Sequence, residues 1–219
     1  MFTSVIRCII FDLDGTLVHS LPGIAASLNR TLKANHLPTH PEANVRRFIG
    51  DGMKMLVRRA TPGIASTQLD ALVEAMRSDY NSTWKEGTQP YPAVTQTLKT
   101  LSQKGILLTV LSNKPDEYCR DITNQLFPEI NLPIVRGQRD DIPQKPDPTG
   151  ALSICQELNI PTSETALVGD STIDLETAKN ADILPIAATW GYHDPPSLAA
   201  MKPQHTITSM DELIPALNP

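Results

Sequence analysis

The sequence predicts an α/β fold, a doubly wound parallel sheet with a small α-helical domain inserted after its first strand. Two observations predict the sheet. Apolar segments of strand length alternate with helical segments, and residues 5–11 form a near-continuous apolar run typical of a strand covered on both faces. A third predicts the insert, because residues 18 to about 89 show helical periodicity and no convincing strand. We therefore expect a core domain of residues 1–17 and 90–219 and a helical domain of residues 18–89.

The insert divides into three helical stretches. Ser20 suits the N-cap of the first stretch, and Pro22 suits its first turn. The sequence Gly50-Asp51-Gly52 interrupts the second stretch, because glycine disfavours helix interiors. The third stretch begins near Ser66 and has one apolar face, which consists of Leu69, Leu72, Val73, Met76 and Tyr80.

The rest of the core continues the alternation of helices and strands. Strands are expected at residues 106–111, around 134–135, and at 165–168, 183–188 and 205–207. Helices are expected at residues 93–104, from 115, at 148–158 and 175–180, and after 210. Right-handed crossovers between parallel strands then place helices on both faces of the sheet.

The composition is that of an ordinary globular protein, with 40% hydrophobic and 20% charged residues. A net charge of −5 without a long Lys or Arg run gives no footprint for nucleic acid or an anionic membrane. The sequence contains no apolar stretch near the ~20 residues of a membrane span and no signal-peptide pattern. Three widely spaced cysteines match neither a disulfide framework nor a metal motif, so we expect a cytoplasmic protein.

Polar side chains follow three of the predicted core strands. Asp12 and Asp14 follow the first strand, Ser112 follows the second, and Asp170 with Asp174 follows the strand at 165–168. Each group alone can be explained as turn chemistry or as a helix cap. Open α/β sheets bind ligands beyond the carboxyl ends of their strands, so the shared position predicts one site.

Lys145 adds a cation in a loop stiffened by Pro146 and Pro148. By itself, a lysine in such a loop is more often a solvated surface charge. Together with the carboxylates, it completes the set that phosphoryl transfer through an aspartyl phosphate requires. We expect Lys145 to place a positive charge between nucleophile and phosphate. The Ser112 hydroxyl and the Asn113 amide are expected to donate to phosphate oxygens.

The carboxylates divide into a nucleophile, a general acid and metal ligands. Asp12 is the expected nucleophile, and Asp14 is expected to protonate the leaving oxygen and then activate a water molecule. Mg²⁺ suits an all-oxygen site, and its expected ligands are the Asp12 carboxylate, the Asp14 backbone carbonyl and the Asp170 carboxylate. Asp174 is expected to orient a bound water or Lys145.

Four segments resemble the four motifs of the haloacid dehalogenase-like (HAD) hydrolase superfamily. They are Asp12-x-Asp14-Gly15-Thr16, Ser112, Lys145-Pro146 and Gly169-Asp170-Ser171-x-x-Asp174. The resemblance implies a Rossmann-like core, and the helical insert resembles the cap domain of the first subclass. Within this family, three further segments are similar to phosphoglycolate phosphatases, namely Ile49-Gly50-Asp51-Gly52, Ser112-Asn113-Lys114-Pro115 and Thr189-Trp190-Gly191-Tyr192.

The resemblance also gives the insert a function, because a cap that closes over a small substrate excludes water. The break at Gly50 is a candidate specificity loop, with Arg47 or Lys54 as contacts to a substrate carboxylate; solvated helix charges explain these two residues equally well. His19 stands where the family often has Asp, and we expect a partly exposed residue at the entry to the cap.

We therefore expect a Mg²⁺-dependent phosphatase of small phosphomonoesters, with 2-phosphoglycolate as the leading substrate. A phosphomutase or a pyrophosphatase would use the same site. A haloacid dehalogenase would leave Asp14 and Asp170 without a role, and a phospho-accepting receiver domain has no place for the helical insert. A degenerate binding protein fits poorly, because every chemical group is present. The expected partner is a small phosphorylated metabolite, without nucleic acid or membrane, and the chain is expected to be a monomer or small homo-oligomer.

Overall fold

The computed structural model describes residues 5–217, and the chain forms two compact units. One unit, here the core unit, comprises Met1–Val18 and Pro90–Pro219, and the other, the helical unit, comprises His19–Gln89. At the boundary, β2 (Val18–His19) and β3 (Gln89–Pro90) pair as a two-stranded sheet. The expectation of no strand in residues 18–89 was wrong here, because two residues are too few for an alternating pattern to show.

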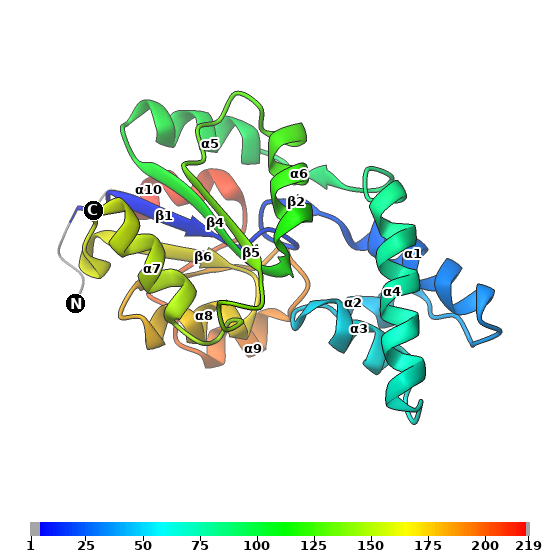
Figure 1. Cartoon of the computed structure of the whole chain (residues 1–219). Coiled ribbons are helices and arrows are strands. Elements are labelled where there is room, and N and C mark those ends of the chain that lie inside the picture. Colours follow the sequence, from blue (N-terminus) through cyan, green and yellow to red (C-terminus); the bar gives the residue numbers. More distant parts are fainter. Residues whose placement is uncertain (1–4, 218–219) are drawn as a thin grey trace. The chain divides into compact units, whose positions relative to one another are not determined.

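The core unit is built on a six-stranded parallel sheet in the order β5-β4-β1-β6-β7-β8 (Figure 1). Its strands are β1 (Cys8–Phe11), β4 (Leu107–Pro115), β5 (Ile134–Gln138), β6 (Thr165–Gly169), β7 (Leu184–Ala188) and β8 (His205–Ile207). The chain winds outward from β4 to β5, then returns to β6 and winds the other way. The first strand, β1, lies at this reversal, where open α/β sheets bind their ligands.

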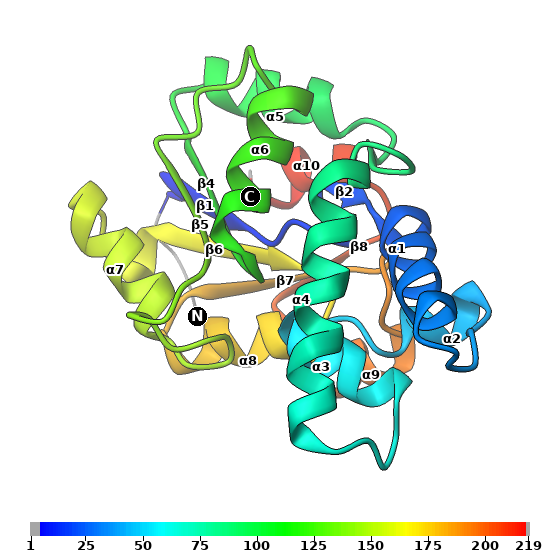
Figure 2. The same ribbon diagram turned by 45° about the vertical axis from the view of Figure 1, so that its right-hand side comes forward.

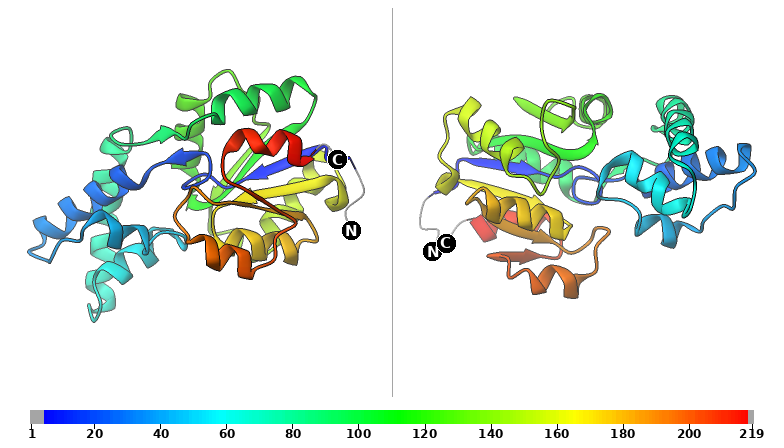
Figure 3. Two further views of the ribbon diagram at one scale, coloured as in Figure 1. Left: turned by 180° about the vertical axis from the view of Figure 1, so that it is seen from behind. Right: turned by 60° about the horizontal axis from the view of Figure 1, so that its bottom comes forward.

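Helices cover both faces of this sheet (Figures 1 and 3). One face carries α5 (Val94–Gln103), α6 (Asp116–Leu126) and α10 (Leu213–Leu217), and the other carries α7 (Thr149–Leu158), α8 (Thr172–Asn180) and α9 (Pro195–Ala200). Two 3-10 turns, η1 (Thr162–Glu164) and η2 (Met210–Glu212), precede β6 and α10. Every residue of β1, β6 and β7 is buried, as expected of strands covered on both faces. The predicted doubly wound α/β fold is confirmed.

The helical unit consists of α1 (Leu21–Ala34), α2 (Glu42–Arg46), α3 (Gly52–Ala60) and α4 (Ser66–Thr83), and α4 packs against α1 and α3 (Figure 2). The predicted apolar face of α4 is buried from Leu69 to Tyr80. Ser20 stands at the N-cap of α1 but makes no side-chain capping hydrogen bond. Glycines break the second stretch as predicted, since Gly50 and Gly52 have φ angles of 127° and 79° that favour glycine. Within residues 5–217, no helix combines the length and apolar character needed to cross a bilayer.

Candidate active site

The carboxyl ends of β1, β4 and β6 bring three of the predicted segments to one edge of the sheet. Phe11, the last residue of β1, is in register with Val110 of β4 and Val168 of β6. Asp12 follows directly, and its N–H donates to the Val168 carbonyl at 3.0 Å. Because β6 ends at Gly169, Asp170 leaves the sheet close to Asp12, as the parallel arrangement requires.

Lys145 joins two of the predicted carboxylates. Its Nζ donates to Asp12 Oδ1 at 2.8 Å and to Asp174 Oδ1 at 2.5 Å, with 4% of the lysine side chain exposed. Asn113 holds the lysine backbone on both sides: its Nδ2 donates to the Lys145 carbonyl at 3.0 Å, and its Oδ1 accepts from the Lys145 N–H at 2.9 Å. Asn113 therefore fixes the segment from which the ammonium reaches the site. The Lys145–Pro146 peptide bond is cis.

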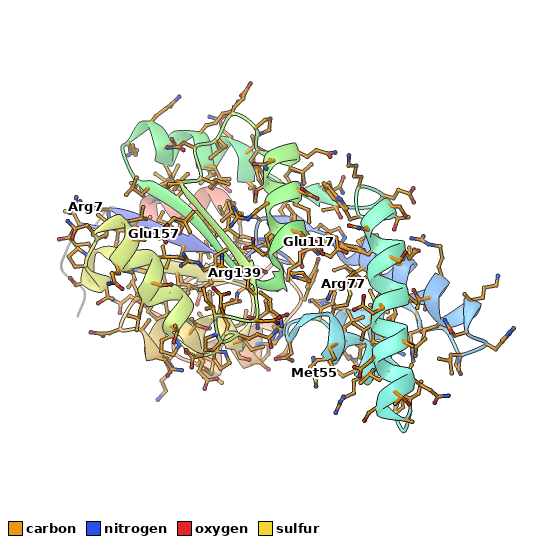
Figure 4. The ribbon with its side chains drawn as sticks, viewed as in Figure 1. Arg7, Met55, Arg77, Glu117, Arg139 and Glu157 are labelled. Carbon is orange, nitrogen blue, oxygen red and sulfur yellow. The ribbon has the colours of Figure 1, made fainter. Side chains whose placement is uncertain are left out.

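The loop that carries Lys145 is tied down at both ends. It runs from β5 to α7, and Arg136 on β5 donates to Ser153 Oγ at 2.7 Å and to Glu157 Oε2 at 2.8 Å on α7. Glu157 extends from α7 in Figure 4. Farther along, the Pro146 carbonyl accepts a hydrogen bond from Asn180 Nδ2 at 3.0 Å. These contacts restrict the movement of the loop that carries Lys145, because they link it and its two flanking elements to the sheet and to α8.

Asp170 is enclosed by hydrogen-bond donors and by glycine. Thr16 Oγ1 donates to its Oδ1 at 3.0 Å, and the Tyr192 N–H donates to its Oδ2 at 2.6 Å. A Cβ placed on Gly15 would lie 2.4 Å from Asp170 Oδ2, and one placed on Gly191 would lie 2.2 Å from Asp170 Cβ. Only glycine leaves room for the carboxylate at both positions, so the surrounding loops hold Asp170 in one place.

Asp174 is fixed at the start of α8 by a capping box. The Ser171 N–H and hydroxyl donate to Asp174 Oδ2 at 3.0 and 2.6 Å, and the Asp174 N–H donates back to Ser171 Oγ at 3.2 Å. The other carboxylate oxygen receives the Lys145 ammonium. The expected contact between Asp174 and Lys145 is therefore present, and local helix chemistry determines its geometry.

Three buried carboxylates, of Asp12, Asp170 and Asp174, offer oxygen atoms that lie within 4.8 Å of one another. Lys145 supplies one positive charge to two of them, so the ionised cluster carries an excess of negative charge. An all-oxygen carboxylate set with uncompensated charge is the kind of donor set that binds Mg²⁺. The residues present thus fit a divalent cation.

The pKa values report the same excess of charge. Burial raises the pKa of Asp12 to about 6; Lys145 lowers it, but less strongly, and Asp174 adds to the rise. Burial, followed by repulsion from Asp12 and Asp174, raises the pKa of Asp170 well above its usual value. For Lys145, burial would lower the pKa, yet its contacts with Asp12 and Asp174 hold it above the ordinary value. The ammonium is therefore charged, and the raised pKa values of Asp12 and Asp170 show that a further cation beside them would favour their ionised forms.

Asp14 and Ser112 lie beside a residue that sequence reasoning did not assign. Lys114 Nζ lies 3.1 Å from Asp14 Oδ2 and 3.3 Å from Asp14 Oδ1, and both side chains are largely buried. Ser112 is 5% exposed, and its Oγ accepts from the Lys114 N–H at 3.4 Å. The sequence does not indicate this contact, because a lysine near a strand end usually points to solvent. Its place directly after Ser112 and Asn113, two predicted site residues, was the available signal.

Thr16 and Tyr192 belong to sequence motifs that do not indicate the contacts of either residue. Both donate to Asp170, one through its hydroxyl and the other through its backbone. Trp190, which lies in the same segment as Tyr192, donates from Nε1 to the Thr16 carbonyl at 3.1 Å. The segment after β7 therefore supports the loop after β1 as well as Asp170.

The predicted cap residues belong to the helical unit. Arg47 is exposed at the C-terminal end of α2, and Lys54 Nζ lies 2.7 Å from Asp70 Oδ1, with both side chains more than half exposed. Gly50 lies in the loop between α2 and α3. His19 is partly exposed in β2. The parts of Arg47, Gly50 and Lys54 in substrate binding stay predictions.

Comparison with known proteins gives one family. The family model for haloacid dehalogenase-like hydrolases matches residues 9–188. A phosphoglycolate phosphatase of Pseudomonas fluorescens is 33% identical over 217 residues, which is 95% of this chain and 79% of that protein. A phosphoglycolate phosphatase of Pectobacterium atrosepticum is 29% identical over 98% of this chain and 93% of its own length.

Solved structures agree. A predicted phosphoglycolate phosphatase from Haemophilus somnus superposes with a TM-score of 0.91 at 27% identity, covering 97% of this chain and 98% of its own. Since the family model spans more than half of the chain and the relatives match almost all of it, the chain belongs to the haloacid dehalogenase-like hydrolases.

Proposed function

We propose that this hydrolase is a Mg²⁺-dependent phosphatase of small phosphomonoesters that acts through an aspartyl phosphate, with 2-phosphoglycolate as its leading substrate. The single observation that carries the proposal is the buried contact of Lys145 with Asp12 and Asp174, beside Asp170 at the carboxyl edge of the sheet. The names of the relatives, phosphoglycolate phosphatases matched over most of the chain, support the choice of substrate.

The first half-reaction transfers the phosphoryl group to the protein. An oxygen of Asp12 attacks phosphorus, and the bond from phosphorus to the alcohol oxygen breaks. Asp14 donates a proton to that departing oxygen. Lys145 keeps positive charge next to the nucleophile, which reduces its repulsion from the phosphate dianion. Ser112 and Asn113 are proposed phosphate-binding residues, and Asn113 also serves by fixing Lys145.

The second half-reaction releases phosphate. Asp14, now ionised, takes a proton from a water molecule whose oxygen attacks phosphorus, and the bond from phosphorus to Asp12 breaks. Asp12 leaves as a carboxylate beside Lys145, and the products are inorganic phosphate and the resting enzyme. Asp174 holds the lysine in place throughout.

The metal site is proposed for the same residues. The Asp12 and Asp170 carboxylates and the Asp14 backbone carbonyl would hold Mg²⁺, and Asp174 would orient a bound water or Lys145. When bound, the ion neutralises charge on the phosphate oxygens. Thr16 and Tyr192 keep Asp170 aimed at the cluster through their hydrogen bonds.

The two units are proposed to divide the work. The core domain, residues 1–17 and 90–219, carries the groups of the chemical step, and residues 18–89 act as a cap. Arg47, Gly50 and Lys54 are proposed to take part in substrate recognition by this cap. Support comes from the positive φ angles of Gly50 and Gly52, because a glycine without a Cβ lets the backbone come close to a bound ligand. We also propose a cytoplasmic location, in keeping with three free thiols among the described residues.

A substrate panel tests the proposal. Phosphate release from 2-phosphoglycolate, sugar phosphates, pyrophosphate and p-nitrophenyl phosphate is measured with Mg²⁺ and with EDTA. We expect turnover that requires the metal, fastest with 2-phosphoglycolate. Asp12→Asn should reduce turnover to less than about 1% without changing the fold, because a covalent nucleophile contributes many orders of magnitude to the rate. The exposed Asp211→Asn is the matched control.

Three outcomes would contradict the proposal. Isomerisation of a sugar phosphate without phosphate release would indicate a mutase, and preference for pyrophosphate a pyrophosphatase. Substantial activity in Asp12→Asn would refute the nucleophile.

A further inference from the structure

Lys114 is a buried cation that the proposed mechanism does not use. It lies near the end of β4, with 5% of its side chain exposed, and its ammonium contacts both oxygens of Asp14 at 3.1 and 3.3 Å. Burying an ammonium group costs free energy unless negative charge surrounds it. A lysine at this position is therefore placed to meet anions.

The backbone of Lys114 is held from three directions. Its N–H donates to Ser112 Oγ at 3.4 Å, and its carbonyl accepts from Cys119 Sγ at 3.5 Å. A Cβ placed on Gly137 of β5 would lie 2.6 Å from the same carbonyl oxygen, so the neighbouring strand packs closely against it. The backbone is therefore fixed, and the buried side chain extends from it to Asp14.

Asp14 relates this ammonium to the substrate. In the proposed reaction, the Asp14 carboxyl comes within about 3 Å of the ester oxygen that it protonates. Lys114 Nζ lies 3.1 Å from the same carboxyl, so it stands within about 6 Å of that ester oxygen. Lys145 contacts Asp12 and Asp174 instead. In the proposed reaction, the two lysines therefore lie on opposite sides of the bond that breaks. Lys145 lies on the side of the phosphoryl group, and Lys114 lies on the side of the leaving alcohol.

We propose that Lys114 is a specificity residue that binds an anionic group on the leaving alcohol, a carboxylate one carbon away from the ester oxygen. The inference rests on the proposed function and deepens it by naming the residue that selects a carboxylated substrate. As Asp14 turns toward the ester oxygen, its contacts with Lys114 weaken, and the substrate carboxylate supplies negative charge to the buried ammonium. An alcohol of the same size with a neutral group offers no such charge, and the site discriminates against it.

The experiment compares two esters that differ at this one group. We measure kcat/KM for 2-phosphoglycolate and for 2-hydroxyethyl phosphate, with Mg²⁺, in the wild type and in Lys114→Met. The wild type should prefer the carboxylated ester at least about tenfold, the size of one charge-assisted hydrogen bond. For 2-phosphoglycolate, Lys114→Met should lose about 10- to 100-fold in kcat/KM, mainly through a higher KM. For the neutral ester, the loss in kcat/KM should be smaller by a factor of at least about ten.

Two further variants serve as controls. Lys114→Arg keeps the charge and should retain part of the preference. Lys104→Met removes an exposed positive charge from the core unit and should leave the ratio of the two esters unchanged. Equal losses of Lys114→Met on both esters, in kcat rather than KM, would overturn the inference and make Lys114 a positioning residue for Asp14.

If Lys114→Met fails to fold, Lys114→Gln, which keeps a polar side chain without the charge, is measured in its place. Loss of the preference for the carboxylated ester in Lys114→Gln would support the inference; equal kcat/KM for the two esters in the wild type would overturn it. A failure of the proposed function looks different. In that case neither ester releases phosphate in the presence of Mg²⁺, and the inference falls with it.

Discussion

Lys145 Nζ and Asp12 Oδ1 lie 2.8 Å apart although the two residues are 133 positions apart in the sequence. The contact joins the end of β1 to the loop between β5 and α7, and a second contact with Asp174 reaches the start of α8. One ammonium thus connects three segments of the core unit. Because all three side chains are buried, the free energy of folding and the chemistry depend on the same charges.

Replacing Lys145 with Met should damage activity and stability together. The substitution leaves Asp12 and Asp174 buried without their cation, and removing one partner of a buried pair costs about 3 to 5 kcal/mol. We expect a loss of this order in the free energy of unfolding, measured by urea denaturation in EDTA, and almost complete loss of turnover. Lys104→Met is the control, because its side chain is exposed. Unchanged stability in Lys145→Met would mean that the cluster ionises differently.

The order of strands and helices could be predicted from the sequence because local periodicity encodes it. Of the apolar run predicted at residues 5–11, Cys8–Phe11 form β1 and are buried as expected, whereas Val5 and Arg7 precede the strand and are exposed. The predicted apolar face of α4 is buried. The course of β4 was harder to predict. It continues to Pro115 through Ser112 and Asn113, polar residues that suggest a strand end in the sequence but are buried here.

The contacts within the site were less accessible to sequence reasoning. The spacing of the motifs indicated which segments meet, because parallel strands share an edge. Spacing says nothing of partners, so the hold of Asn113 on Lys145 and the pairing of Lys114 with Asp14 emerged only from the structure. Gly191 shows the same limit. A side chain at this position would collide with Asp170, which lies 21 positions earlier in the sequence, so only the structure explains the glycine.

Asp170→Asn should stabilise the metal-free protein and remove its response to Mg²⁺. Burial and repulsion from Asp12 and Asp174 raise the pKa of Asp170, so its charge is unfavourable without a cation. The Asn side chain can keep both hydrogen bonds, because the Thr16 hydroxyl can turn while the Tyr192 N–H still meets an oxygen. Thermal unfolding in EDTA should occur at a higher temperature than in the wild type. Added Mg²⁺ should shift the wild type only, and an equal shift in the variant would exclude Asp170 as a ligand.

Stability in EDTA should depend on pH through Asp12. Its pKa rises from 3.8 in the unfolded chain to about 6 in the folded protein, chiefly through burial. The neutral form is therefore favoured by folding: its contribution is complete below pH 3.8 and is lost as the pH rises through about 6. The free energy of unfolding is measured against pH for the wild type and for Asp12→Asn. The wild-type value minus the Asp12→Asn value should decrease between pH 3.8 and about 6. A constant difference would contradict the raised pKa of Asp12.

Gly191→Ala should disrupt the site more than an ordinary glycine substitution does. The new Cβ would lie 2.2 Å from Asp170 Cβ, so Asp170 or the segment after β7 must move. Gly105→Ala is the matched control, because a Cβ there has nothing within 4 Å and the φ of +79° alone costs about 1 kcal/mol. We expect Gly191→Ala to lose more stability than this control in urea denaturation, and to lose turnover and the response to Mg²⁺, which Gly105→Ala retains. If Gly191→Ala keeps its thermal shift with Mg²⁺, the position of Asp170 is not what the cation requires, and the metal site proposed here would have to lie elsewhere among the carboxylates.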